Sequence, residues 1–98
     1  MSTMRQSAFW MKQLDERILE YINEHGWATP SMMARHSRFT ASSGHISERC
    51  QMLHYIRFIE PIYGDAYELT TDGAQYLDGQ IDARFRPWPT VDRVLRGK

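Results

Sequence analysis

The stretch "TASSGHISERCQMLHYI", residues 40–56, combines a capped helix start, one apolar seam and an outward face of polar side chains. Ile46, Cys50 and Leu53 recur at i, i+4 and i+7, which predicts the buried side of a helix. Hydroxyl, imidazole, carboxylate and amide groups occupy the other sides, and such groups can hydrogen-bond to base edges in the major groove of DNA. We predict as base-reading candidates Ser43, Gly44, His45, Ser47, Glu48 and Gln51. An ordinary solvated helix face is the alternative interpretation of the same residues.

Arginine side chains near such a helix can hold DNA phosphates and thereby set its register. Arg38 precedes the helix and Arg49 lies on its flank, so we predict both as phosphate contacts, with Arg35 and Arg57 as weaker candidates. A surface salt bridge is the alternative role for Arg38 or Arg49. The formal net charge is +0, from 12 basic and 12 acidic residues, so the total charge gives no argument for nucleic acid.

The sequence does not predict a metal or catalytic centre. Cys50 and His54 share i, i+4 spacing, but Cys50 belongs to the apolar seam and no second ligand pair has the spacing of a zinc site. We find no phosphate-binding glycine loop, no Ser/His/Asp order and no facing carboxylates. We therefore expect no enzyme activity, no cofactor and no small-molecule ligand. A single cysteine and the lack of an apolar run near the roughly 18 residues of a membrane helix predict a cytoplasmic protein that does not enter a membrane.

Two shorter patterns precede the polar helix and must position it. The segment "LDERILEYINEHG", residues 14–26, has the apolar stripe of an amphipathic helix and ends in glycine. After a short extended link, residues 30–36 predict a second helix that Thr29 caps. A tight turn then leads to the third helix, which Ser42 or Thr40 caps.

A hairpin follows the third helix. Gly64 and Asp65 lie between two apolar runs and predict its turn, since glycine supplies the positive φ that such turns require. Pro61 confines its strand to an edge or a bulge. The hairpin also carries Glu60 and Glu68, so we predict a short wing that makes little contact with DNA phosphates.

Helical spacing returns after the hairpin. Ala74, Leu77, Ile81 and Phe85 recur on one side of a fourth helix, and Thr90 could cap a last short helix. The order of elements predicts an α+β, mainly α fold: a winged helix-turn-helix with a three-helix core, a two-stranded wing and an additional C-terminal helix. We divide the chain into an N-terminal arm, a winged-helix domain and a C-terminal extension for dimerisation or a basic tail, which are residues 1–12, 13–79 and 80–98.

Both ends carry more apolar side chains than a small core can absorb. We predict that they form a homodimer interface, and wrapping of the monomer is the alternative. A twofold dimer would double the number of reading helices and match a palindromic site. The dimerisation candidates are Phe9, Trp10, Phe85, Trp88, Val91, Val94 and Leu95.

Several stretches, in order, resemble the archaeal phage PhiH repressor-like family of winged-helix regulators: "LDERILEYINEHG", "ATPSMMA", "GHISERCQMLHYIRFIEPI" and "YELTTDGAQYLDG". The resemblance spans residues 10–80 and implies an archaeal, DNA-binding transcription regulator, usually a dimeric repressor, whose helix Ser42 to Tyr55 reads double-stranded DNA. By this resemblance, the helix opening that matches the family pattern is Ser43 to Arg49. Family members commonly have a glycine just after the third helix, where this chain has "HYIRF".

A protein interaction module on the same scaffold is the alternative function. The zero net charge, the acidic hairpin and Glu48 on the exposed face favour it. A continuous basic surface beside the third helix would instead favour DNA.

Overall fold

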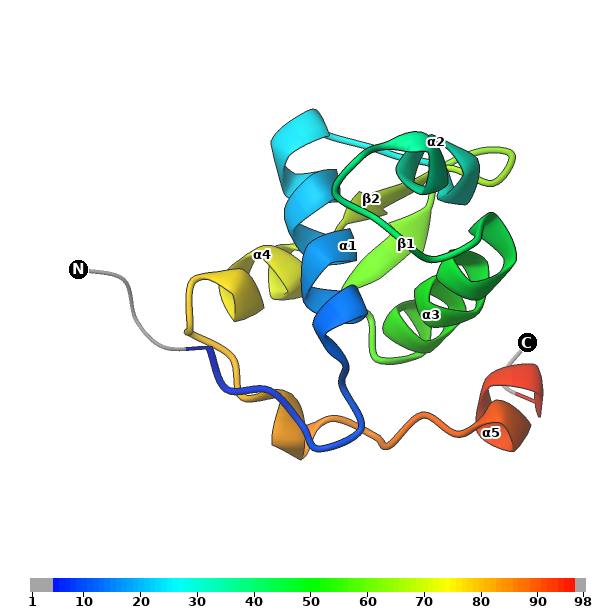
Figure 1. Ribbon diagram of the computed structural model, residues 1–98. Coiled ribbons are helices and arrows are strands. Elements are labelled where there is room, and N and C mark those ends of the chain that lie inside the picture. The colour runs from blue at the N-terminus through cyan, green and yellow to red at the C-terminus, as the bar shows by residue number, and fades with distance from the viewer. Residues whose placement is uncertain (1–4, 97–98) are drawn as a thin grey trace.

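The computed structural model describes residues 5–96, and side chains as far as Val94. The elements in chain order are α1 (Gln13–His25), α2 (Pro30–Arg35), α3 (Ser43–Tyr55), β1 (Ile59–Pro61), β2 (Tyr67–Leu69), α4 (Thr71–Leu77), the 3₁₀ turn η1 (Ala83–Phe85) and α5 (Val91–Arg96). Helix α3 packs against α1, α2 and β1, and α4 lies beside α1 (Figure 1). This is the predicted mainly helical α+β fold with a winged helix-turn-helix core.

Local side-chain caps explain where the helices begin. The Thr29 hydroxyl accepts a hydrogen bond from the Met32 N–H at 3.1 Å, and the Thr70 hydroxyl accepts one from Gly73 at 3.0 Å. For α3 the cap is Ser42, not Thr40, because the Ser42 Oγ accepts from the His45 N–H at 3.2 Å. Each cap satisfies an N–H group that the first helical turn cannot satisfy itself.

The wing is a short antiparallel hairpin whose turn centres on Gly64 and Asp65, as predicted. Gly64 has a φ of 56°, and the Ala66 N–H donates to the Tyr63 carbonyl at 3.1 Å to close the turn. Strands β1 and β2 pair in the register Ile59↔Leu69, Glu60↔Glu68 and Pro61↔Tyr67. The extended link after α1 adds a bridge to this sheet, because Ala28 and Tyr67 exchange both backbone hydrogen bonds.

The prediction that the fourth helix continues through Ile81 and Phe85 is wrong. Helix α4 ends at Leu77, and Gly79 then adopts a φ of 78°, which a continuing helix does not allow. Phe85 is 86% exposed in the separate turn η1. Gly73 lies inside α4 and allows this helix to pack directly on the backbone at Phe58. A Cβ at Gly73 would lie 2.1 Å from the Phe58 carbonyl oxygen.

The N-terminal segment and the chain after α4 lie side by side (Figure 1). Gln6 and Asp82 form a parallel bridge, and the Ala83 N–H donates to the Gln6 carbonyl at 2.8 Å. Ala8 and Ala83 are both buried. The two segments therefore share one packed surface, and their separation into an arm and an extension stays a prediction.

A buried ion pair joins α3 to the start of α1. The Arg49 guanidinium donates to both carboxylate oxygens of Asp15, at 2.8 and 2.7 Å, and Asp15 is fully buried. These hydrogen bonds raise the pKa of Arg49 above its ordinary value. The same carboxylate accepts from the Lys12 N–H at 2.9 Å, so it also caps α1. The guanidinium lies over the Trp10 ring, 5.9 Å from its centroid.

Arg57 occupies the position after α3 at which a left-handed backbone is needed. Its φ is 67°, and the Phe58 N–H donates to the Leu53 carbonyl at 3.1 Å while the Arg57 N–H donates to His54 at 2.9 Å. This pattern is a Schellman cap, whose left-handed residue is usually glycine. The Thr70 hydroxyl holds the Arg57 carbonyl at 2.5 Å. The chain thus keeps a side chain at a strained position.

Asp15→Asn should strongly destabilise the fold, because it leaves the buried Arg49 charge without a carboxylate. We expect a loss of about 3–5 kcal/mol in the free energy of unfolding, measured by urea denaturation. Arg84→Gln is the matched control, since it breaks an exposed pair with Asp82. An Asp15→Asn midpoint equal to that of the control would contradict a structural role for the pair.

Arg57→Gly should stabilise the fold, because glycine adopts the left-handed conformation without steric strain. We expect a gain of about 1 kcal/mol in the free energy of unfolding from thermal or urea denaturation. Arg57→Ala is the control, since alanine removes the side chain but keeps the Cβ strain. Equal stability of the glycine and alanine variants would show that the backbone at this position is not strained.

Candidate nucleic-acid interface

The opening turn of α3 presents its polar groups outward. Ser43, Gly44, His45 and Glu48 are exposed, and Ser47 is half-buried. A Cβ built on Gly44 would meet no atom within 4 Å, so this part of the backbone is open to close approach. The His45 Nδ1 lies 3.4 Å from the Glu48 Oε1, which is a loose contact on the surface. This turn therefore offers hydrogen-bonding groups that the fold itself does not occupy.

The expectation that Arg49 contacts phosphates is wrong for this geometry. Arg49 is only 8% exposed, and its guanidinium is held by Asp15 and by the Trp10 carbonyl at 3.4 Å. A phosphate could reach it only by displacing a buried carboxylate. Arg49 instead fixes the buried side of α3 to α1 through its ion pair with Asp15.

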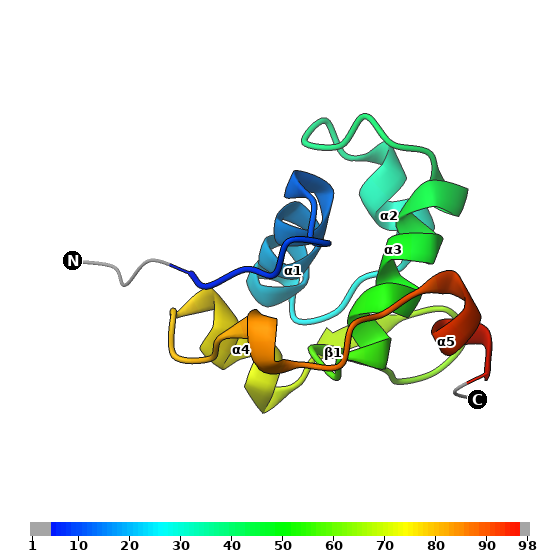
Figure 2. The same cartoon turned by 90° about the horizontal axis from the view of Figure 1, so that it is seen from below.

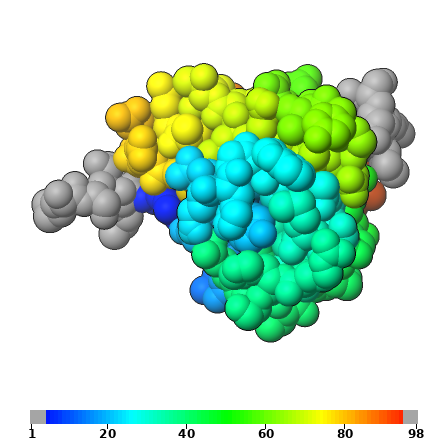
Figure 3. All heavy atoms as spheres, turned by 90° about the horizontal axis from the view of Figure 1, so that it is seen from above, coloured from blue at the N-terminus to red at the C-terminus, as the bar shows by residue number. Residues whose placement is uncertain are grey.

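The other predicted phosphate residues lie apart from one another. The two terminal nitrogens of Arg38, Nη2 and Nη1, lie 2.9 and 3.2 Å from the two carboxylate oxygens of Glu24. The guanidinium also lies over the Tyr21 ring. The hydrogen bond from Arg38 lowers the pKa of Glu24. Figure 3 shows the end of α1 and the segment from α2 to α3 as one continuous surface. The ion pair of Arg38 with Glu24 joins these two segments.

Arg35 is exposed on α2, whereas Arg57 follows the far end of α3. At a rise of about 1.5 Å per residue, Arg57 lies roughly 20 Å along the helix axis from the opening turn. The structure therefore does not bring the predicted arginines together into one basic surface.

Sequence reasoning missed Lys12 as a cation beside the opening turn. Lys12 is exposed and lines a hollow of about 370 Å³ together with His45, Glu48 and Gln51. Within residues 5–96 it forms no ion pair. Asp15 brings Lys12 close to α3, because its carboxylate accepts from the Lys12 N–H and also binds Arg49 of α3. The pairing of Asp15 with Arg49 is visible only in the tertiary structure.

Helix α5 covers the middle of the outward face of α3. The two helices pack together (Figure 2), and Val94 is only 8% exposed. Gln51 and Val94 both line the hollow that contains Lys12, and both also line a second hollow next to α5. Gln51 is therefore half-buried next to α5, and it is less accessible than the opening turn.

The predicted dimerisation residues fall into two groups. Phe9, Phe85, Trp88 and Val91 are exposed, and the rings of Phe9 and Trp88 meet edge to face with centroids 4.5 Å apart. Trp10 and Val94 instead pack within the chain. The side chain of Leu95 lies outside the described residues.

Over the part of the chain that the structure describes, no three His, Cys, Asp or Glu side chains gather where a metal could bind. Burial raises the pKa of Cys50 to about 12, so its thiol stays protonated at neutral pH.

Among residues 5–96, every helix is too short or too polar to span a membrane.

Comparison with protein-family models and with curated proteins finds no match. Among solved structures, the crystal structure of the PhiH1 repressor-like protein from Haloarcula marismortui is similar to this chain, with 32% sequence identity and a TM-score of 0.83. The match covers 89% of this chain and 99% of that chain, so it includes nearly the whole of the solved protein. Identity and coverage at this level confirm the predicted resemblance: the chain belongs to the PhiH1 repressor-like family.

Proposed function

We propose that this protein is a non-enzymatic, cytoplasmic DNA-binding regulator that inserts the opening turn of α3 into the major groove. The observation that carries the proposal is the set of exposed polar side chains between Ser43 and Glu48. The buried Asp15–Arg49 pair holds the opposite side of α3 against α1. A helix start that is held to the core and carries exposed hydrogen-bonding groups suits base reading. The similar Haloarcula protein is described as repressor-like, and repression is the role we propose here.

Base contacts fall to the first turns of the helix. His45 and Ser47 can bond to base edges, and Glu48 can accept from the cytosine amino group. Gly44 allows the backbone to approach a phosphate or sugar closely. Gln51 can join this set only where α5 moves aside, because α5 packs beside it.

The residues that would contact DNA phosphates are Lys12, Arg38 and Arg35. Lys12 lies next to the reading turn, while Arg38 precedes α3 and can exchange its exposed glutamate partner for a phosphate. The wing works against such contacts, since Glu60 and Glu68 face each other across the hairpin. We therefore propose that the wing stays away from the DNA backbone.

We also propose that the protein acts as a twofold homodimer. The exposed rings of Phe9, Phe85 and Trp88 with Val91 give the two chain ends an apolar surface that the described fold leaves uncovered. A dimer would present two α3 helices to two half-sites. It would also double the small number of cations that each chain offers to DNA.

DNA binding should depend on Lys12. The full chain should select a preferred duplex from a randomised library, and Lys12→Gln should weaken binding to that duplex severalfold at low salt. The slope of log affinity against log salt should fall by about 1 per chain, because one phosphate contact is lost. Fluorescence anisotropy at several salt concentrations measures both effects.

Arg84→Gln is the control for this measurement, since Arg84 is paired with Asp82 and does not line the hollow that contains Lys12. It should leave affinity and salt slope unchanged. If the wild-type chain binds no duplex even at low salt, the protein interaction module is the better assignment.

Dimerisation should depend on the exposed aromatic rings. Phe85→Ser should shift the chain from dimer to monomer in light scattering at high micromolar concentration, because it removes the most exposed ring, which is 86% accessible. Tyr63→Ser is the matched control: Tyr63 is 73% exposed at the wing tip, and its loss should leave the dimer intact. A wild-type chain that scatters as a monomer would rule out this arrangement.

A further inference from the structure

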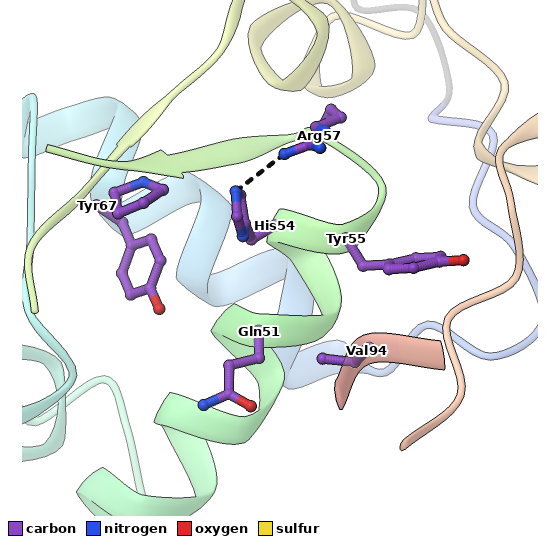
Figure 4. A pocket seen from close by; sticks show the side chains of 7 residues that line it. Gln51, His54, Tyr55, Arg57, Tyr67 and Val94 are labelled. Carbon is purple, nitrogen blue, oxygen red and sulfur yellow. Dashed lines mark hydrogen bonds between the residues drawn. The ribbon is translucent and has the colours of Figure 1, made fainter. Parts of the chain in front are cut away.

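A hollow of about 460 Å³ lies between the C-terminal half of α3, the turn after it, the hairpin and α5 (Figure 4). Its volume lies within the usual range for sites that bind small molecules. It is lined by Gln51, His54, Tyr55, Arg57, Pro61, Tyr67 and Val94. In Figure 4 the Tyr67 hydroxyl and the Gln51 amide point into the same space, and Val94 approaches from α5. Apolar surface and hydrogen-bonding groups thus line one site.

The lining carries positive charge. Arg57 supplies a guanidinium, and none of the described residues that line the hollow is a carboxylate. The Arg57 Nη1 donates to the His54 Nε2 at 3.1 Å, because arginine has no acceptor. Arg57 also lines a second hollow together with Glu60, Glu68 and Asp72, yet among the described side chains no carboxylate lies within ion-pair distance of it. The guanidinium therefore remains able to bind an external anion.

The backbone at Arg57 is a second, independent observation. Arg57 has a φ of 67° in a Schellman cap, where glycine would avoid the strain. The Thr70 hydroxyl fixes its carbonyl, so the backbone cannot relax without losing that contact. Strained residues of this kind persist mainly at functional sites. The protein tolerates this strain, and what it keeps at the position as a result is the Arg57 side chain.

We propose that this hollow binds a small organic anion, whose carboxylate is held by Arg57 and whose apolar body packs against Pro61 and Val94. The Gln51 amide and the Tyr67 hydroxyl would donate further hydrogen bonds. Burial raises the pKa of Tyr67, so its hydroxyl keeps the proton that it would donate. The site uses residues from α3, the hairpin and α5.

A ligand here would contact both the reading helix and the helix that covers it. Because Val94 and Gln51 line the hollow, an occupied site favours the docked position of α5 beside Gln51. Such a ligand would change DNA affinity in proportion to its preference for that position. This effect on DNA rests on the proposed function, whereas ligand binding needs neither DNA nor a dimer.

The test is a titration of the full-length protein with sodium benzoate at constant ionic strength, followed by amide chemical shifts in nuclear magnetic resonance spectra. Saturable shifts should appear at Gln51, Arg57 and Tyr67. Arg57→Gln should weaken binding about tenfold or more, because it removes a charged hydrogen-bond donor. Arg84→Gln is the matched control, since Arg84 is exposed and lies outside the hollow, and it should bind benzoate like the wild type.

Arg57→Gly separates ligand binding from folding, because it should be more stable than the wild type and still bind benzoate poorly. The absence of saturable shifts, or equal affinity in wild type and Arg57→Gln, would overturn the proposal. A parallel titration with inorganic phosphate tests the apolar wall. If phosphate binds as tightly as benzoate, the site takes bare oxoanions such as DNA phosphates, and the proposed organic ligand is wrong.

Discussion

The bidentate ion pair between Arg49 and Asp15 sets the rotation of α3 about its own axis. Ile46, Arg49, Cys50 and Leu53 follow the i, i+3, i+4, i+7 pattern, so one charged side chain lies within the buried stripe of the helix. A buried arginine without its carboxylate would be very unfavourable, and α3 cannot turn away from α1 without creating one. The exposure of the opening turn follows from this constraint, because the residues between the buried positions must face outward.

This orientation gives the two ends of α3 different surroundings. The opening turn borders a hollow that Lys12 and one side of α5 line, whereas the last turns meet α5, the hairpin and the strained turn at Arg57. Among the described side chains of α5, Val94 is the buried one. We infer that the first end of α3 recognises DNA and that the second end responds to whatever holds or frees α5.

Local signals in the sequence predicted the elements, while long-range contacts decided the site. Thr29, Ser42 and Gly64 act on their own neighbours, so helix starts and the hairpin turn could be read from the chain. Arg49 was misassigned because arginine is rarely buried and its partner Asp15 lies 34 positions earlier. Its place three residues after Ile46 was the available signal. The surroundings of Lys12 and Gln51, on which their proposed roles rest, depend on packing between segments that are far apart in the sequence.

In the function that we propose, electrostatics would link DNA binding to dimerisation. The wing brings Glu60 opposite Glu68, and two cations after α4, Arg84 and Arg86, are paired with Asp82 and Asp72. The exposed cation beside the reading turn is then Lys12, which is a weak attraction for a polyanion. Two copies joined through their chain ends would bring two such cations and two opening turns to one duplex. Because counterion release grows with the number of neutralised phosphates, a chain that places so few described cations beside this turn would gain more from pairing than a strongly basic regulator would.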